Sequence, residues 1–274
     1  MERRTVRQDA DGRLTRDGIR IHQQSDFAGM HAAGELAARI LDELAERVDV
    51  GVTTGELDDY IRNRVEEAGA TSATIGYKGY QHASCISINH VVCHGIPGEK
   101  KLKDGDILNI DVTVIVDGWY GDSSRMYVAG KLSRKAERLI QVTHDSLMKG
   151  IDVVKPGNTF GDIGHAIQTF VEGHRMSVVR DFCGHGLGRV FHAPPNVLHY
   201  GRPGTGPVLE EGMFFTIEPM VNLGRAETKV LADDWTAVTR DKSLSAQFEH
   251  SIGVTADGCE VFTLSPAGRF HPTY

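Results

Sequence analysis

Residues 107–128 read ILNIDVTVIVDGWYGDSSRMYV. Two runs rich in β-branched and apolar residues flank Asp117-Gly118, and an Asp-Gly pair between such runs is a strong signal for a two-residue hairpin turn. The sequence therefore predicts a long antiparallel hairpin, and the position of the turn sets its register.

The register of this hairpin decides which polar side chains meet. Counted back from the turn, Asp111 lies opposite Ser124, and Thr113 lies opposite Asp122. Because side chains alternate along a strand, all four share one face. The two aspartates are then diagonal neighbours, about 7–8 Å apart at the backbone, and their carboxylates can converge on one site.

The composition is that of a globular protein. The 274 residues are 40% apolar and 24% charged, which is enough to bury a sizeable core. A net charge of −7 argues against a dedicated nucleic-acid binder, because phosphate binding needs a basic surface. No apolar run approaches the ~20 residues of a transmembrane helix, and residues 1–5 lack the apolar stretch of a signal peptide, so we expect a cytoplasmic protein without membrane contact. The four cysteines have no C-x-x-C spacing and are expected to be free thiols.

The rest of the chain is expected to alternate between helices and short strands. Residues 1–24 are polar and irregular, with one short extended piece at 18–21, and form an N-terminal arm ahead of a single domain at 25–274. Apolar residues at helical spacing predict helices at 25–48, 53–68, 133–150 and 159–172. We expect Ser25 to cap the first helix and Thr53 or Thr54 the second, with Tyr60 on its inward face. Alternating or apolar runs predict strands at 85–89, 178–183, 213–218, 228–239 and 247–254.

A weak internal repeat underlies this order. Three short segments of the first half resemble three segments of the second half and follow in the same order. They are 54–57 with 160–163, 93–95 with 184–186, and 102–111 with 209–218. The last pair ends in an acidic residue each time, Asp111 and Glu218. Two related halves would each offer an acidic strand to a site at a pseudo-twofold axis.

Five side chains that can bind metal ions lie in strands or at strand ends: Asp111, Asp122, His185, Glu218 and Glu249. For each acid alone, a solvated strand face is the better interpretation, but four carboxylates with one imidazole favour a metal site. Such a hard, oxygen-rich set suits a pair of Co, Mn, Fe or Zn ions. Two ions of this kind can share carboxylates and activate a water as a nucleophile at neutral pH, which is hydrolase chemistry.

Two further histidines, His94 and His192, lie in turn sequences near these residues. Either could donate a hydrogen bond to a scissile carbonyl or a tetrahedral oxyanion. A structural turn histidine is an equally good interpretation of each from the sequence alone.

Six short segments together resemble the type I methionine aminopeptidases. They are VVCHGIP (91–97), NIDV (109–112), GDSS (121–124), GHG (184–186), IEP (217–219) and QFEH (247–250), and the resemblance extends over about residues 25–265. It implies an α/β (α+β) pita-bread fold, in which a curved antiparallel sheet is covered by helices and two halves are related by a pseudo-twofold axis. The residues from 25 to 274 would then be a single catalytic domain.

The resemblance also implies roles for individual residues. Asp111 and Glu249 would span a metal pair, Asp122 would bind one metal, and His185 and Glu218 would bind the other. His94, His192 and Glu218 would be catalytic. The substrate pocket would be lined by Tyr77, Tyr80, Cys85, Phe191 and Trp235, with Thr74 where many bacterial members carry cysteine. A monovalent cation, Na or K, is implied near Asn89, Val91 and Ser245.

The implied activity is removal of the N-terminal methionine from nascent polypeptides when the second residue is small, by attack of a metal-activated hydroxide on the first peptide carbonyl. Two alternatives stay open. A proline-specific aminopeptidase or prolidase of the same fold would carry a long extra N-terminal domain, whereas about 25 residues precede the first helix here. A metal-free binding protein on the same scaffold is the other.

The sequence also leads to expectations about partners. We expect a monomer without nucleic-acid specificity. A transient ribosome contact could involve Lys100-Lys101-x-Lys103, for which a solvated run of charges is the simpler interpretation.

Overall fold

The computed structural model describes residues 8–9 and 12–272 and shows a mixed α/β chain. Its helices are η1 (Gln24–Asp26), α1 (Phe27–Leu44), α2 (Thr54–Glu67), η2 (Tyr77–Gly79), α3 (Arg134–Asp152) and α4 (Phe160–Gly173). The strands up to the predicted hairpin are β1 (Gln8–Asp9), β2 (Gly12–Leu14), β3 (Arg20–Ile21), β4 (Thr71–Ser72), β5 (Cys85–Ile88), β6 (Val91–Cys93), β7 (Ile107–Val116) and β8 (Trp119–Val128). Those that follow are β9 (Ser177–Val178), β10 (Gly184–Gly186), β11 (Ala193–Val197), β12 (Phe214–Ile217), β13 (Met220–Asn222), β14 (Thr228–Val230), β15 (Ala237–Thr239), β16 (Ser245–Gln247), β17 (His250–Val254) and β18 (Cys259–Val261).

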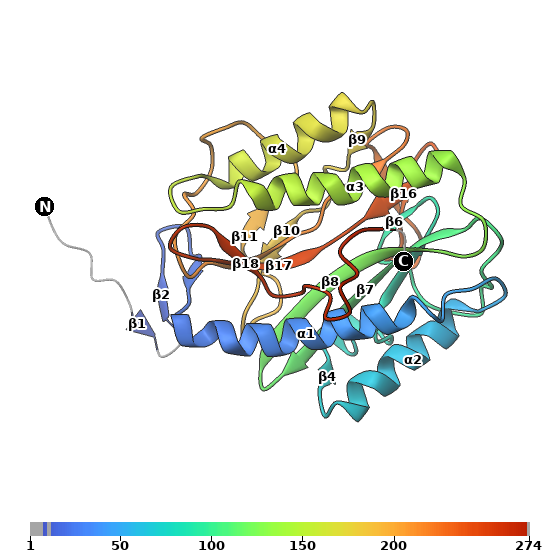
Figure 1. The fold of residues 1–274 in the computed structure, drawn as a ribbon, viewed down its shortest axis with the longest axis horizontal. Helices are drawn as coiled ribbons and strands as arrows, with labels where there is room; N and C mark the ends of the chain where they lie inside the picture. The colour runs from blue at the N-terminus through green and yellow to red at the C-terminus, as the bar shows by residue number, and fades with distance from the viewer. Residues whose placement is uncertain (1–7, 10–11, 273–274) are drawn as a thin grey trace, which may run out of the picture.

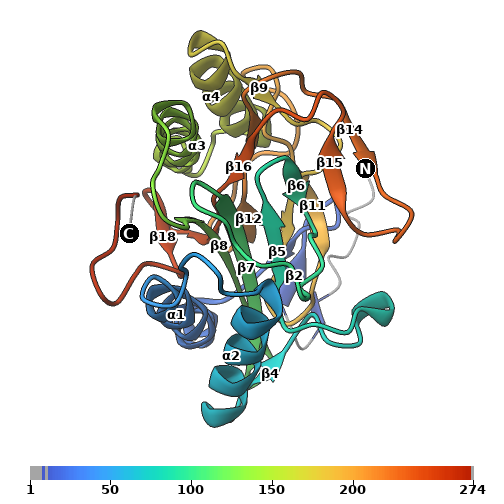
Figure 2. The ribbon, with the colours of Figure 1, turned by 90° about the vertical axis from the view of Figure 1, so that its right-hand side faces the viewer.

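Antiparallel strands form the centre of the molecule, and helices cover them. The hairpin sheet contains β4, β7, β5 and β8, and the largest sheet has the order β11-β10-β12-β17-β18. Shorter sheets, β16-β13-β9 and β14-β15-β6, continue the central strands. Figure 1 shows α1 on one side of the long β7–β8 hairpin and α3 with α4 on the other. In the view of Figure 2, α1 and α3 lie to one side of the strands and β14 with β15 to the opposite side. No helix in the described ranges is both long and apolar enough to cross a membrane.

The chain divides into an N-terminal half, residues 27–129, and a C-terminal half, residues 134–261, each with its own helix pair. In the N-terminal half, apolar side chains of α1 and α2 pack with Ile110, Val112 and Val114 of β7. In the C-terminal half, α3 and α4 pack against buried residues of β12, β16 and β17. Close approach of α1 to the hairpin requires Gly121, because a Cβ there would lie 2.2 Å from Ala33 O.

The internal repeat corresponds to matching local structure. Thr53 N-caps α2, and it donates its N–H and its hydroxyl to the Glu56 carboxylate at 2.7 and 2.9 Å. Thr159 N-caps α4 and makes the same two bonds to Asp162 at 2.7 and 2.8 Å. Each threonine also forms an isolated bridge, with Lys101 in the first half and Val208 in the second. The repeat is therefore present as equivalent helix starts in both halves.

The first helix differs from the expectation at both ends. Ser25 does not cap it; residues 24–26 form a 3-10 turn with Gln23 as its N-cap, and α1 runs only from Phe27 to Leu44. Tyr60 of α2 packs against the edge of the core of the N-terminal half, which agrees with the expected inward face only in part. It is half-buried, donates a hydrogen bond to Glu43 at 2.8 Å and lies under the guanidinium of Arg47.

Three strand predictions need correction. Of the strand expected at 178–183, only Val178 lies in a strand, β9 (Ser177–Val178), and the rest of the segment is irregular up to β10. The segment 228–239 is two strands with a turn between them, and 247–254 is interrupted at 248–249. Apolar composition indicated extended chain in each case, but pairing partners decide where a strand ends.

The N-terminal arm is more ordered than the polar composition suggests, as far as residues 12–24 show. Ile19 is buried, and the ring of buried His22 stacks on Phe214 with centroids 4.2 Å apart. The residues before 8 and those at 10–11 lie outside the described part of the chain.

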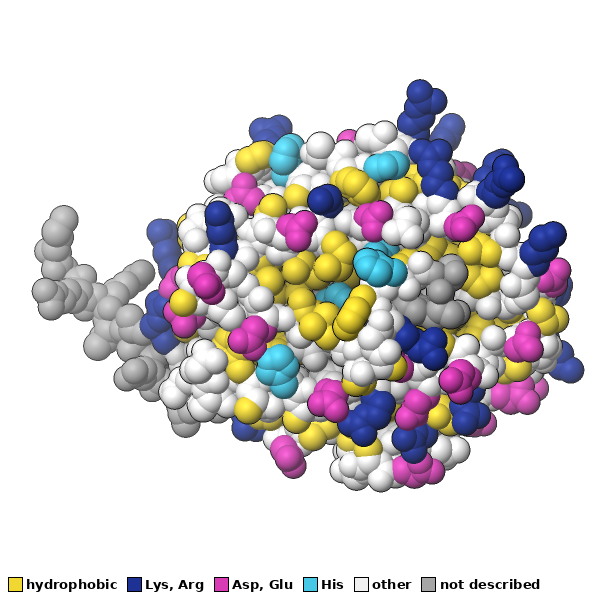
Figure 3. All heavy atoms as spheres, viewed as in Figure 1, with side chains coloured by type: hydrophobic (Ala, Val, Ile, Leu, Met, Phe, Trp, Pro, Cys, Tyr) yellow, Lys and Arg dark blue, Asp and Glu magenta, His cyan; other side chains and the backbone are white. Residues whose placement is uncertain are grey.

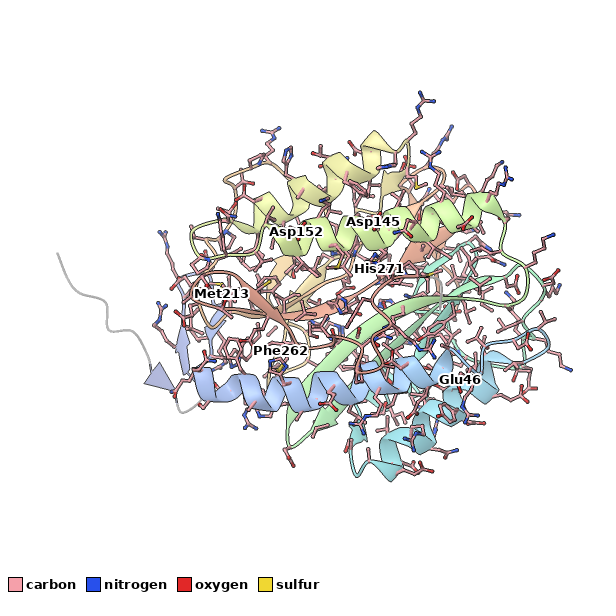
Figure 4. All side chains as sticks on the ribbon, viewed as in Figure 1. Glu46, Asp145, Asp152, Met213, Phe262 and His271 are labelled. Atoms are coloured by element: carbon pink, nitrogen blue, oxygen red, sulfur yellow. The ribbon has the colours of Figure 1, made fainter. Side chains whose placement is uncertain are left out.

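The last segment, residues 262–272, crosses the helix-bearing face. Phe262 packs edge-on against Phe27 and Phe214 at 5.6 and 5.1 Å, and Figure 4 shows it just above α1, with His271 nearer to α3. Figure 3 shows hydrophobic side chains gathered in the middle of this face and most Lys and Arg side chains toward its edge. The segment thus covers the space between the helix pairs of the two halves.

Candidate metal centre and substrate pocket

The β7–β8 hairpin carries two aspartates. Asp111 pairs with Ser124 and Thr113 with Asp122, which is the register expected from the Asp-Gly turn. Thr113 Oγ1 donates a hydrogen bond to Asp122 Oδ1 at 2.7 Å and orients that carboxylate. Asp111 lines the same cavity, and its Oδ1 is buried without a hydrogen-bond partner among the described residues. That oxygen is desolvated and available to a cation.

The C-terminal half brings the other three expected ligands from three separate elements. His185 lies in β10, Glu218 directly follows β12, and Glu249 lies between β16 and β17. Several hydrogen bonds attach this half to the hairpin. Among them, Ser123 Oγ donates to Glu249 O at 2.8 Å, Glu249 N donates to Ser124 O at 3.1 Å, and Ser251 Oγ donates to Asp122 O at 2.7 Å. Backbone contacts between the halves therefore set the position of Glu249.

The ligand atoms converge. Asp122, His185 and Glu249 each offer one atom within 4.8 Å of the others. His185 Nε2 lies 3.5 Å from Asp122 Oδ2 and 3.7 Å from Glu218 Oε1. Its Nδ1 lies 3.1 Å from Gly186 O. In the tautomer with the proton on Nδ1, that contact is a hydrogen bond and Nε2 faces the carboxylates as a ligand atom.

Burial shapes the electrostatics of this cluster. It raises the pKa of Asp111 well above its usual range, and the charges of Asp122 and Glu218 raise it further. Burial and neighbouring carboxylates likewise raise the pKa of Glu249, and burial raises that of Glu218 to about 7. Burial alone would lower the pKa of His185, but Asp122 and Glu218 beside it raise the pKa above its usual value. The group therefore calls for compensating positive charge.

This donor set fits divalent metal ions. Carboxylates with one imidazole suit Mn, Fe, Co or Zn, and the partnerless Asp111 oxygen lies on the same cavity. Thr216 Oγ1 donates to Glu218 Oε1 at 2.8 Å and accepts the backbone N–H of His185 at 3.0 Å. Gln247 Nε2 donates to Glu218 Oε2 at 3.2 Å. These contacts hold the side chains in the orientation that a metal would need.

A cavity of about 380 Å³ adjoins the cluster. All the side chains assigned to substrate by the resemblance line it: Thr74, Tyr77, Tyr80, Cys85, His94, Phe191, His192 and Trp235. The rings of Tyr77 and Phe191 lie 5.0 Å apart, and those of Tyr80 and Trp235 lie 4.8 Å apart. The structure thus joins an aromatic pocket to the carboxylates.

The thiols and hydroxyls of the pocket are held in uncharged form or engaged with backbone. Burial raises the pKa of both Cys85 and Cys93, and nearby carboxylates add to the rise. Tyr80 Oη donates to Ser84 O at 2.9 Å, and Thr74 Oγ1 donates to His82 O at 2.7 Å. The cavity wall is therefore largely uncharged away from the metal-ligand cluster.

His94 and His192 both adopt left-handed backbone conformations, with φ of 57° and 59°. Such conformations in non-glycine residues occur often at functional loops. Burial lowers the pKa of His94, and burial followed by the charge of His185 lowers that of His192 to about 4. Both rings are therefore neutral at pH 7, and each has one N–H to donate.

Known proteins share this arrangement over most of their length. The model of "Metallopeptidase family M24" matches residues 28–256. The methionine aminopeptidase of Rickettsia prowazekii (strain Madrid E) is 58% identical over 257 residues, covering 93% of this chain and 99% of that protein. The methionine aminopeptidase of Escherichia coli (strain K12) is 53% identical over 251 residues, covering 90% of this chain and 94% of that protein. The chain belongs to the methionine aminopeptidases of family M24.

Solved structures agree with that membership. The crystal structure of methionine aminopeptidase from Rickettsia prowazekii matches with a TM-score of 0.89 at 59% identity, covering 90% of this chain and 100% of that one. The prolidase from Pyrococcus horikoshii OT3 matches with a TM-score of 0.72 at 20% identity, covering 89% of this chain and 63% of that one, which shows the fold alone. The family and the pita-bread fold expected from the sequence are confirmed, and the enzyme is a metallopeptidase.

Some residues that line the cavity of this metallopeptidase were not predicted from the sequence. Lys78, Asp181, Phe182 and Met220 are among them. Met220 follows Glu218 by two residues, so alternation past the proline would have suggested it. Asp181 and Phe182 lie in a loop and Lys78 in the short η2 turn, where no periodic pattern assigns a direction.

The residues expected near a monovalent cation come from two segments that are far apart in the sequence but lie side by side in the structure. Ser245 N donates to Asn89 O at 2.8 Å, and Val91 begins β6 two residues later. The Asn89 side chain is engaged elsewhere, since its Nδ2 donates to Asp106 at 2.7 Å and its Oδ1 accepts the Ile107 N–H at 3.1 Å. The main-chain oxygen of Asn89, which also accepts the Ser245 N–H, has a second lone pair that could face a cation.

Proposed function

We propose that the enzyme removes the N-terminal methionine of polypeptides whose second residue is small. The observation that carries this proposal is the single cavity of about 380 Å³ that contains both the metal-ligand side chains and an uncharged aromatic wall. An unbranched thioether fits between aromatic rings and protonated thiols, which are soft and uncharged. The membership in the methionine aminopeptidases supports the same assignment.

The expected ligand side chains are Asp111, Asp122, His185, Glu218 and Glu249, and they would hold a pair of divalent metal ions. When bound, the metals would polarise the scissile carbonyl and make a water acidic enough to act as a nucleophile at neutral pH. Which of Co, Mn, Fe or Zn serves is part of the proposal to be tested.

Glu218 would accept the proton of the attacking water and pass it to the leaving amine. Burial raises the pKa of Glu218 to about 7 in the metal-free enzyme, and bound cations would lower that pKa again, so that the ionised carboxylate could accept a proton. Thr216 and Gln247 each donate to one of its two oxygens, which fixes the carboxylate plane.

His94 and His192 would bind the scissile peptide. Both are neutral at pH 7 and line the cavity, so each can donate a hydrogen bond to the carbonyl oxygen or accept one from the peptide nitrogen. The ring of His192 lies 4.2 Å from that of His185, which places it next to the metal-ligand cluster.

The proposed function includes a domain organisation, a location, a bound cation and a partner. Residues 25–274 act as one catalytic domain, as a monomer in the cytoplasm, on the N-termini of nascent polypeptides. Main-chain oxygens of Asn89, with Val91 and Ser245, bind Na or K. Lys100, Lys101 and Lys103 are exposed and available for a transient ribosome contact.

A peptide panel tests the function. Metal-free enzyme is refilled with each metal in turn, and products are read by mass spectrometry. Met-Gly, Met-Ala and Met-Ser termini should be cleaved fast, and Met-Leu, Met-Phe and Met-Lys slowly, because the second residue must pass the cluster in a narrow space. Formyl-Met should block cleavage. Changed side-chain shape in an apolar pocket costs ~1–3 kcal/mol, so Leu or norleucine at position one should be weaker substrates. Comparable rates on Ala-Pro peptides would instead support the proline-specific alternative.

A further inference from the structure

A second cavity, of about 510 Å³, shares no lining residue with the first. It lies between the N-terminal segment and the β10–β11 loop, residues 187–192. Side chains from both line it, including Arg20 and His22 on one side and Arg189 on the other, with Trp119 from the start of β8. We call it the arginine cavity.

Within residues 8–9 and 12–272, no carboxylate pairs with either arginine of this cavity. The guanidinium of Arg20 makes no hydrogen bond or ion pair with any described residue, and its Nη1 is fully buried. Arg189 lies over the ring of Trp119 at 4.2 Å and donates from Nη1 to Asp117 O at 3.3 Å. A buried guanidinium nitrogen without an acceptor is costly, so the site is short of negative charge.

The positive charges of Arg20 and Arg189 both act on the His22 imidazole. The buried imidazole of His22 has its pKa lowered to about 4, chiefly by burial, and the charges of both Arg20 and Arg189 contribute to the lowering. His22 is therefore neutral at pH 7 and adds no charge of its own.

One acidic side chain, Asp26, is found among the described residues of the lining, and it is committed elsewhere. Its Oδ2 accepts the Gln23 N–H at 2.8 Å and lies 3.8 Å from His22 Nδ1. Neither arginine lies within ion-pair distance of it in the described structure. The net balance of the cavity thus favours an anion.

We propose that the arginine cavity binds a small molecule with a doubly charged oxyanion, either a phosphoryl group or a dicarboxylate. A guanidinium offers a fork of N–H donors that matches the oxygens of both groups. The volume exceeds that of a lone phosphate, and Leu187, Val190 and Phe214 provide apolar wall for a small organic body.

Such a ligand would contact the reverse side of the loop that carries Phe191 and His192. The loop is tightly attached here: Tyr120 N donates to Gly188 O at 2.9 Å, and a Cβ on Gly188 would lie 2.7 Å from the His22 ring. Arg189 is three residues from His192, so the arginine cavity and the metal-centre cavity share one short segment of chain.

Fluorescence of Trp119 tests binding at this place. The chain has two tryptophans, and Trp235 lines the other cavity, so Trp235→Phe leaves Trp119 as the single reporter. The metal-loaded Trp235→Phe enzyme is titrated with inorganic phosphate and with succinate at constant ionic strength. We expect a saturable change in Trp119 emission, and the tighter of the two anions identifies the class of ligand.

Matched arginine variants distinguish anion binding in the arginine cavity from a general attraction of anions to positive charge. In the Trp235→Phe background, Arg20→Gln should weaken anion binding about tenfold, because a hydrogen-bonded charge is lost. Arg189→Gln, on an exposed loop, gives a second variant with the same expected loss, measured by calorimetry because this residue touches the reporter. Arg16→Gln is the control, since Arg16 is exposed in the same N-terminal segment and does not line the cavity. Absence of saturation with both anions, or equal weakening by Arg16→Gln, would overturn the proposal.

Discussion

The N-terminal half supplies Asp111 and Asp122 from one hairpin, whereas the C-terminal half supplies His185, Glu218 and Glu249 from three elements that are far apart in sequence. The two aspartates are set by strand register, which depends on a turn of two residues. The other three depend on contacts such as Ser123 with Glu249 and Thr216 with His185. Expected ligands placed by local register and expected ligands placed by packing can therefore be compared within one site.

The largest loss of activity is expected when one of the expected ligands of the C-terminal half is replaced. His185→Ala and Glu249→Ala should each lose bound metal and turnover together, with activity reduced by at least about a hundredfold, because metal activation of water and carbonyl is lost. Asp122→Ala tests the N-terminal half in the same way. Elemental analysis and hydrolysis of Met-Ala-Ser measure the two quantities.

Glu66→Ala serves as the control for these variants, since Glu66 is an exposed carboxylate on α2. Full activity in His185→Ala or Glu249→Ala, with two metals still bound, would contradict their assignment as ligands. It would leave the hairpin aspartates as the only supported part of the centre.

A smaller effect is expected at the histidine next to the cluster. His192→Ala should keep its metals and lose ~10²–10³ in turnover, as is typical for one lost donor to a developing oxyanion. His94→Ala is the counterpart from the N-terminal half. A fall in metal content in step with activity would make His192 a ligand and add a fourth to the C-terminal half.

The pH dependence of stability sharpens the electrostatic side of the comparison. In the metal-free enzyme, Glu218 has its pKa raised from 4.5 to about 7, so the folded state holds a proton that the unfolded state has lost between these values. Its contribution is therefore fully present below about pH 4.5 and is lost as pH rises through about 7, by up to about 3 kcal/mol. The raised pKa values of Asp111 and Glu249 act in the same direction.

Urea unfolding of metal-free enzyme at pH 5 and pH 8 measures this change. Buried histidines with lowered pKa values, such as His22 and His192, act in the opposite direction, so the contribution of Glu218 is isolated by comparison with Glu218→Gln. Between pH 5 and pH 8 the wild-type enzyme should lose more free energy of unfolding, or gain less, than Glu218→Gln, because only the wild type must ionise this buried carboxyl group. Equal responses of the two proteins to pH would show that Glu218 is not desolvated as described.

The smallest effect compares the repeated helix starts directly. Thr53→Ala and Thr159→Ala should each lower the free energy of unfolding by about 1 kcal/mol, because each removes an N-cap threonine hydroxyl that hydrogen-bonds the carboxylate at N3. Thermal or urea unfolding of the metal-loaded enzyme would measure it. Ser133→Ala at α3, whose side chain accepts the Ala136 N–H at 3.3 Å without a reciprocal carboxylate, should cost less. If the two substitutions lowered the free energy of unfolding by amounts that differ severalfold, the two helix starts would share their geometry but not their contribution to stability.

The sequence by itself determined the features that depend on near neighbours along the chain. The hairpin register follows from Asp117-Gly118 and alternation, and the start of α2 follows from Thr53 with an acid three residues later. The family motifs are also local strings of a few residues, which is why the sequence alone predicts the fold and the five expected ligands.

Tertiary structure decided what near neighbours cannot encode. Ile19 and His22 lie in a polar segment and are nonetheless buried, because the chain folds back onto Phe214. Of the strand expected at 178–183, only Val178 pairs, since no partner strand among the described residues runs beside the rest. Phe182 lines the metal-centre cavity from a loop and Lys78 from the short η2 turn, where direction depends on the packing of distant elements. The arginine cavity arises for the same reason: Arg20 and Arg189 are 169 positions apart, and only the docking of the N-terminal segment on the β10–β11 loop brings their charges together.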